Sequence, residues 1–291
     1  MKLQHIAAAL ALVATGAANA AVQGGTNGDG SLFLIAFDNQ NGTTTSAFFD
    51  LGYTLNSFAS AAGNGSSSAL GVLAAPNTTV VWNFNTNTVS LNGGQVTTLG
   101  TNSWNAAFTT LLANADQGEI QWVVGANDTV GFGANKRSLI SGNVNATAQQ
   151  REAQNAGNNS NLALITNPQN NDIFYPLTNK GTIGSADNGA YTFTAADGPT
   201  TRSNGYVMAG DGFGNNWRNA NKMGGTVYAG QENGLWLADG LGNEQLVGRL
   251  VFSAEAGTLT FVTTPVPEPS TYAMALLGLG VVGLMARRRR A

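Results

Sequence analysis

The chain has 291 residues, only 10% of them charged, a formal net charge of −3 and no cysteine. This length suffices for one large β domain or two smaller ones. Without cysteine there is no disulfide framework, no thiol nucleophile and no thiolate metal ligand, and the small acidic charge gives no reason to expect binding to DNA, RNA or anionic lipid.

The first twenty residues have the pattern of a secretory signal peptide. Lys2 supplies the positive start, an apolar stretch follows, and the small residues Ala18 and Ala20 precede the expected cleavage point before Ala21. The alternative is a buried N-terminal helix. The signal-peptide pattern predicts export through Sec and cleavage by signal peptidase.

Residues 21–265 alternate short apolar runs with turns rich in Asn and Gly, which predicts many short strands. Residues 31–37 are expected to form a buried strand that pairs with residues 43–55 around an Asn41-Gly42 turn. The clearest hairpin joins residues 246–253 to 258–262, with Gly257 in the tight turn. Further strands are expected within residues 78–85, 86–100 (with a turn at 92–94), 118–127, 138–142 and 234–239.

Two stretches predict helices. Apolar residues recur with helical spacing at Trp104, Ala107, Phe108, Leu111 and Leu112. Either Asn102 or Ser103 can cap that helix at its start, and residues 146–157 predict a short exposed helix that ends at Gly157.

These elements together indicate a mainly β fold, a β-sandwich or jelly-roll-like domain with one or two short helices. We expect one extracytoplasmic domain over residues 21–265, with a boundary near residues 145–160 as the alternative. Trp82, Trp122 and Trp236 lie in strand-like runs and Trp104 on the helix face, so all four are expected in the core.

The body has little equipment for catalysis. Its only histidine, His5, lies in the signal peptide, so Ser-His-Asp triads, Cys-His pairs and the usual zinc sites are excluded from the mature body. A Ser-Lys pair would need a buried lysine, and Lys136, Lys180 and Lys222 all lie in polar stretches. We therefore expect no enzyme activity.

Two kinds of carboxylate chemistry remain open. A glycoside hydrolase needs two carboxyl groups across a cleft, and the available residues are Glu119, Asp211, Glu232, Asp239 and Glu244. Structural calcium is the second, because residues 27–30, 210–216 and 238–244 carry oxygen ligands on turn-like backbone, although none has the EF-hand spacing. Otherwise no cofactor is expected.

A candidate carbohydrate contact lies in the loop "GNNWRNANK". Trp217 can stack on a sugar face while Arg218 and the neighbouring Asn side chains hydrogen-bond to its hydroxyls; the alternative is that Trp217 packs beneath its own loop.

The chain ends "VPEPSTYAMALLGLGVVGLMARRRRA", which divides into three parts. Two prolines make the first part rigid, residues 272–286 are apolar, and four arginines follow. As a helix the apolar part spans ~22 Å, shorter than the ~30 Å core of a bilayer, and the arginines place their end in the cytoplasm. Such a marginal anchor suits a temporary hold during export better than a permanent span. The alternative is an ordinary tail anchor.

Residues 266–291 resemble the PEP-CTERM sorting signal of Gram-negative exosortase substrates, which joins a Pro-Glu-Pro motif, a short apolar helix and an arginine-rich tail. The resemblance implies that exosortase, a membrane transpeptidase-like enzyme, recognises the motif and removes the tail. The residues that match the sorting motif are Val266, Pro267, Glu268, Pro269, Ser270 and Thr271. The residues that match the membrane stop are Arg287, Arg288, Arg289 and Arg290.

Two functions fit these observations. The first is a structural or adhesive protein of the cell surface or biofilm matrix, anchored transiently in the inner membrane, sorted by exosortase and associated with exopolysaccharide. The second is a secreted glycan-active enzyme that uses an Asp/Glu pair.

Overall fold

A computed structural model of the chain describes part of its residues. The described residues are 30–38, 45–55, 58, 77–98, 104–127, 138–151, 189–194, 227–238 and 244–263.

Within this part of the chain, the strands form one 12-stranded antiparallel sheet. The strand order is β5-β4-β3-β12-β11-β10-β7-β6-β1-β2-β8, and β9 pairs with β6. The strands are β1 (Ser31–Asp38), β2 (Thr45–Thr54), β3 (Thr79–Asn83), β4 (Thr88–Leu91), β5 (Gly94–Thr98), β6 (Gln121–Asn127), β7 (Ser138–Gly142), β8 (Ala190–Phe193), β9 (Val227–Tyr228), β10 (Glu232–Ala238), β11 (Glu244–Ser253) and β12 (Thr258–Thr263).

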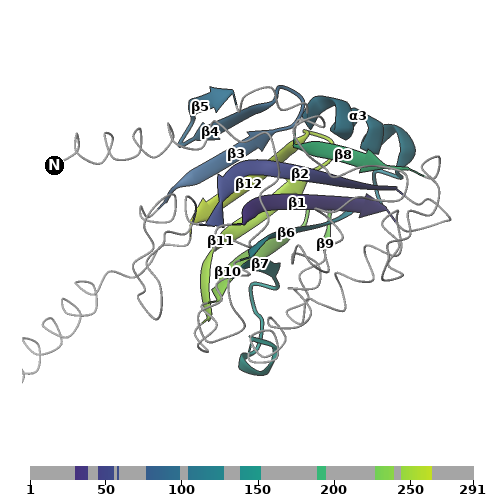
Figure 1. The fold of residues 1–291 in the computed structure, drawn as a ribbon. Helices are drawn as coiled ribbons and strands as arrows, with labels where there is room; N and C mark the ends of the chain where they lie inside the picture. Colours follow the sequence, from purple (N-terminus) through teal and green to yellow (C-terminus); the bar gives the residue numbers. More distant parts are fainter. Residues whose placement is uncertain are drawn as a thin grey trace, which may run out of the picture.

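The sheet curls until its two halves face each other (Figure 1). Phe49 of β2 lies 4.8 Å from Phe84, which follows β3, measured between ring centroids. Tyr53 of β2 meets Trp82 of β3 edge to face at 6.0 Å. One sheet thus supplies both layers of a sandwich-like core, and the prediction of a mainly β, sandwich-type fold is confirmed.

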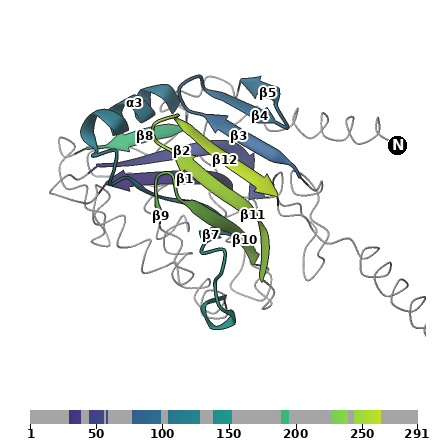
Figure 2. The ribbon, with the colours of Figure 1, turned by 180° about the vertical axis from the view of Figure 1, so that it is seen from behind.

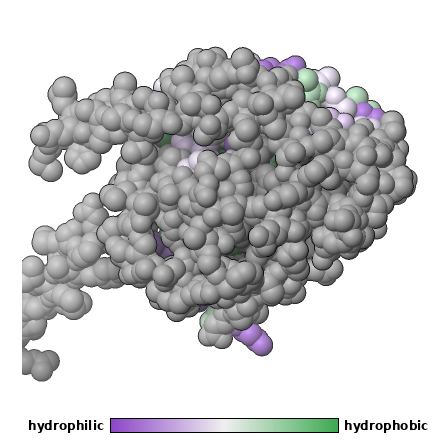
Figure 3. Space-filling view, in the orientation of Figure 1, coloured by the Kyte–Doolittle hydropathy of each residue, from purple (hydrophilic) through white to green (hydrophobic). Residues whose placement is uncertain are grey.

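Helix α3 (Trp104–Asn114) lies over β2 and β8 (Figure 1). It buries Trp104, Ala107, Phe108 and Leu111, and Leu112 packs against the same core, so the predicted apolar face is confirmed. The Trp104 indole Nε1 donates to the Asp50 carbonyl at 2.8 Å, which joins the helix to β2. Its predicted caps, Asn102 and Ser103, lie outside the described residues. The exposed side of α3 mixes hydrophilic and hydrophobic residues (Figure 3).

Strand β1 is buried on both of its faces. Leu32, Leu34 and Ala36 belong to the central core, and the alternate residues Phe33, Ile35 and Phe37 are 0–1% exposed although they lie outside that core. An uninterrupted apolar run is typical of a strand covered on both sides, so the prediction of a buried strand at residues 31–37 is confirmed.

The hairpins follow the turn residues. β1 pairs with β2 and β11 with β12, as expected, and β10 pairs with β11. Asn92 and Gly93 have φ of 51° and 80° and Gly257 has φ of 64°, a left-handed backbone that Asn and Gly adopt most readily. The Asn41-Gly42 turn lies outside the described residues.

The second predicted helix begins as a capping box. The Thr147 hydroxyl accepts from the Gln150 backbone N–H, and the Gln150 side chain accepts from the Thr147 backbone N–H at 2.9 Å. Residues 148–151 are helical, and the rest of the predicted helix lies outside the described residues.

The four tryptophans expected in the core are buried, with exposures of 0% for Trp82, Trp104 and Trp122 and 6% for Trp236. The prediction for these residues is confirmed, and none of their rings lies open on the surface.

Candidate functional site

The end of β12, the last described strand, is held in place by hydrogen bonds. The Thr263 backbone N–H donates to the Thr78 carbonyl at 2.9 Å, and the Thr263 hydroxyl accepts from the Thr78 N–H at 2.8 Å. Thr263 is 4% exposed, and β12 pairs with β3 on one side and β11 on the other. The chain therefore leaves the middle of the sheet from a fixed point, immediately before the proline-rich motif.

The outer side of β3, β12 and β11 forms an open face, which we define by two rows of residues across the strands. One row is Val81, Thr260 and Val251, and the next is Thr79, Val262 and Arg249. Val262 is 41% exposed, and the Arg249 side chain is 52% exposed. Figure 2 looks onto this side of the sheet. The open face offers hydroxyls, methyl groups and one cation.

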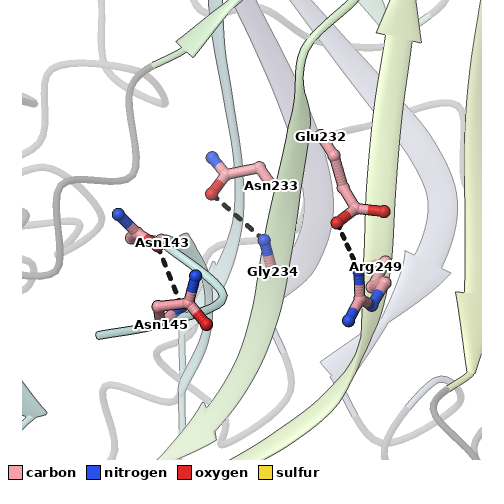
Figure 4. Close-up of polar contacts among 6 residues, drawn as sticks. All are labelled: Asn143, Asn145, Glu232, Asn233, Gly234 and Arg249. Atoms are coloured by element: carbon pink, nitrogen blue, oxygen red, sulfur yellow. Dashed lines mark hydrogen bonds and ion pairs between the residues drawn. The ribbon is translucent and has the colours of Figure 1, made fainter. Parts of the chain in front are cut away.

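Glu232 and Arg249 form an ion pair at the margin of the open face. The Arg249 Nη1 donates to the Glu232 Oε1 across the β10–β11 pair (Figure 4). Both side chains are more than two-fifths exposed, so water screens the pair and its net stabilisation is about 0–1 kcal/mol. Glu232 is therefore an exposed residue whose carboxylate pairs with Arg249.

A polar cluster surrounds Trp236 on the neighbouring part of the sheet. The Trp236 Nε1 donates to the Asn143 carbonyl at 3.2 Å, and the Arg151 guanidinium lies 5.5 Å from the ring centroid. Asn143 in turn accepts from the Asn145 N–H at 2.8 Å, within the tight turn that Figure 4 shows beside β10. The indole is covered, so this cluster does not present a ring on which a sugar could stack.

Asp50 is a buried carboxyl group in the middle of β2. Its Oδ1 accepts from the Gly52 N–H at 2.8 Å, and its Oδ2 accepts from the Ser31 hydroxyl at 3.1 Å. Burial raises the pKa of Asp50 from 3.8 to about 7, and the two hydrogen bonds offset this only in part. The sequence does contain a signal for this residue, an aspartate inside the apolar run "AFFDLGY", but our list of candidate acids did not include it.

Two pairs of the described carboxylates lie far apart along paired strands. Asp50 lies opposite Phe33 of β1, five residues from Asp38 (38 − 33 = 5), which corresponds to ~17 Å along the strand. Glu232 lies opposite Val251, seven residues from Glu244 (251 − 244 = 7), or ~23 Å. Glycosidase pairs lie about 5 to 9.5 Å apart, so neither combination has the required spacing. Asp116 and the candidate acid Glu119 lie in the segment between α3 and β6, where the Asp116 N–H donates to Asp38 Oδ2 at 2.7 Å.

The residues predicted for signal cleavage, carbohydrate contact and sorting lie outside the described part of the chain. This holds for the cleavage residues Ala18, Ala20 and Ala21, for Trp217 and Arg218, and for the whole sorting signal from Val266 onward. Asp211 and Asp239 lie outside it as well. Their roles stay predictions.

Comparison with known families decides the nature of the C-terminal segment. Residues 265–290 match the family model of the PEP-CTERM protein-sorting motif. The chain carries a PEP-CTERM sorting signal. The matched span contains the Pro-Glu-Pro motif, the apolar stretch and the four arginines, so the resemblance seen in the sequence is confirmed. No curated protein and no solved structure matches the chain.

A PEP-CTERM signal implies an exported protein that is anchored in the membrane transiently and sorted by exosortase. None of the helices among the described residues has the length and hydrophobicity of a membrane span. The predicted apolar helix at residues 272–286 lies beyond them.

Among the residues that the structure describes, no three Asp, Glu, His or Cys residues are placed to hold a metal ion together. Of the three stretches considered for calcium, only Gly30, Ala238 and Glu244 are described, so structural calcium stays a prediction.

Proposed function

We propose that this PEP-CTERM protein is a structural or adhesive component of the cell surface or extracellular matrix that associates with exopolysaccharide. The observation that carries the proposal is the sorting signal at residues 265–290, joined directly to the last strand of a β-sheet body. Export and exosortase sorting bring the body outside the cytoplasm, where it can meet exopolysaccharide.

The body supports this role by its chemistry. The open face offers the hydroxyls of Thr79 and Thr260 beside the methyl groups of Val81, Val251 and Val262, which together suit a hydrated, neutral polymer. Trp217 and Arg218 are the proposed carbohydrate contact. Trp236 is covered by Arg151, so the proposed stacking is assigned to Trp217.

The proposal predicts that Trp217→Ala weakens retention of the exported protein on purified exopolysaccharide about tenfold. An aromatic contact contributes about 0.5–1.5 kcal/mol beyond its buried area, and about 1.4 kcal/mol corresponds to a tenfold change. Retention is measured by sedimentation with the insoluble polymer. Thr109→Ala, on the exposed side of α3, is the control and is expected to leave retention unchanged. Equal retention of the wild-type and Trp217→Ala proteins would contradict the carbohydrate contact.

The same polymers distinguish the enzyme alternative. A glycan-active enzyme would release soluble sugar, and one Asp or Glu substitution would abolish the release. The proposal predicts no release from the wild-type protein and none from the Glu119→Gln or Glu232→Gln variants. Release that a single carboxylate substitution removes would overturn the structural role.

A further inference from the structure

The folded body and the sorting motif are joined by a very short tether. Thr263 is held by Thr78, the residue before β3, and by pairing with β11, and the family match begins at Pro265. From Thr263 to Pro267 there are four residue steps (267 − 263 = 4), which span at most ~14 Å even when fully extended. Whatever binds the Pro-Glu-Pro motif must therefore come within about that distance of the end of β12.

Strand β11 runs on past the point where β12 stops. Thr263 lies opposite Gly248, and β11 begins at Glu244, so β11 continues for four residues (248 − 244 = 4), or ~14 Å. β10 accompanies this extension, with Leu237 opposite Gln245. Figure 1 shows β10 and β11 continuing past the arrowhead of β12. The extension, which we call the overhang (Leu237 and residues 244–247), has about the length of the tether.

The opposite end of β11 lies far from the overhang. β11 covers nine residue steps (253 − 244 = 9), or ~30 Å, before the turn at residues 254–257. The Phe84 N–H donates to the Gly257 carbonyl at 2.8 Å, so the turns at 84–87 and 254–257 lie side by side at that far end. Glu255 is exposed there.

We propose that the body docks on exosortase through the overhang, with the turns at 84–87 and 254–257 directed away from the enzyme. A tether of ~14 Å forces the enzyme surface close to the end of β12, and the overhang projects over the same distance on the adjacent strand. Leu237, Glu244, Gln245 and Leu246 are all partly exposed, so their side chains are accessible to a partner. The proposal rests on exosortase processing and adds the surface that meets the enzyme.

The cysteine-free chain permits a direct test by single-site cross-linking. Glu244→Cys and Glu255→Cys are the same substitution at the two ends of β11. Each full-length variant is labelled with a short photocrosslinker on membranes that contain an exosortase variant able to bind the motif but not to cut it. The expected cross-linking to exosortase from position 244 is about five times that from position 255, because only the first lies within tether reach.

A second arm varies the tether itself. Ten Gly/Ser residues inserted after Thr264 extend the reach by ~17 Å, the average span of such a flexible linker, and are expected to bring the two yields to within about twofold of each other. Equal yields with the native tether, or a higher yield from position 255, would overturn the proposal, as would no cross-link from position 244. Gln245→Cys replaces Glu244→Cys if that variant does not melt at the wild-type temperature.

The outcomes separate the docking surface from the sorting itself. If the Glu244→Cys and Glu255→Cys variants cross-link equally while active exosortase still removes the arginine tail, only the docking surface is refuted. Retention of the tail in the wild-type chain in the presence of active exosortase refutes processing, and the proposal with it.

Discussion

Asp50→Asn is expected to raise the free energy of unfolding by about 4 kcal/mol at pH 8 and to change it little at pH 4. The pKa of Asp50 is about 7 in the folded protein, against 3.8 for a solvated carboxyl, a difference of about 3 units at 1.36 kcal/mol each. A raised carboxyl pKa means that the fold favours the neutral form. The stability of the wild-type protein is therefore lost as the pH rises from about 4 to 7.

The amide introduced by Asp50→Asn would have no charge to bury and would keep both contacts, since its oxygen accepts from Gly52 and its nitrogen donates to the Ser31 hydroxyl. Urea denaturation of both proteins between pH 4 and 8 gives the difference directly. Ser31→Ala serves as the second variant: it removes a donor to the carboxylate, so it should destabilise the protein more at pH 8 than at pH 4. Parallel stability curves for wild type and Asp50→Asn would contradict the burial of this carboxyl.

Gly248→Ala is expected to destabilise the protein by about 3 kcal/mol, because overpacking a close interior contact costs roughly this much. A Cβ at Gly248 would lie 2.2 Å from Cε2 of Phe261 and 2.6 Å from the Val262 carbonyl oxygen. Gly248 belongs to β11 and Phe261 to β12, and the Phe261 ring is fully buried in the core. To relieve this close contact, the Phe261 ring would have to move or the two strands would have to separate.

Gly118→Ala is the matched control for Gly248→Ala. Its Cβ would meet nothing closer than the Asp116 side chain at 3.5 Å, which is ordinary contact. Stability is expected to stay within about 1 kcal/mol of wild type. Chemical denaturation measures the stability of both variants. Equal denaturation midpoints for Gly248→Ala and Gly118→Ala would show that β11 and β12 are not packed as closely as described.

Local patterns in the sequence predict the elements whose partners are near in the chain. The helical spacing from Trp104 to Leu111 predicts the buried face of α3, and Gly257 predicts the turn between β11 and β12. The uninterrupted run in β1 predicts a strand buried on both sides. In each case the periodicity or the turn residue acts over a few residues, so one sequence is enough to see it.

Elements that depend on distant partners escaped prediction. β8 has four residues and β9 two, and they pair with β2 and β6, more than a hundred residues away along the chain. Strands this short carry no readable alternation. The burial of Asp50 likewise arises from the fold around it. Gly248 lies beside the irregularity in β10–β11 pairing, and a lone glycine in a strand does indicate such a bulge or a close approach.

The candidate site also contains one part that the sequence reveals and one part that only the fold reveals. The sorting signal is a linear motif, so it is recognisable without the fold, and the family match confirms the signal. The roles of its individual residues stay predictions. The tether and the overhang depend on where β12 ends relative to β11, which is a property of the sheet register. No local pattern around Glu244 indicates that this residue extends past the end of β12.

Mass spectrometry of the mature C-terminus tests the central claim most directly. Surface and matrix material is collected from cells with and without exosortase, and the last residue of the protein is determined. The account predicts that Arg287, Arg288, Arg289 and Arg290 are absent from the protein when exosortase is present and retained at the membrane when it is not. Surface protein that keeps the intact arginine tail in the presence of exosortase would contradict it.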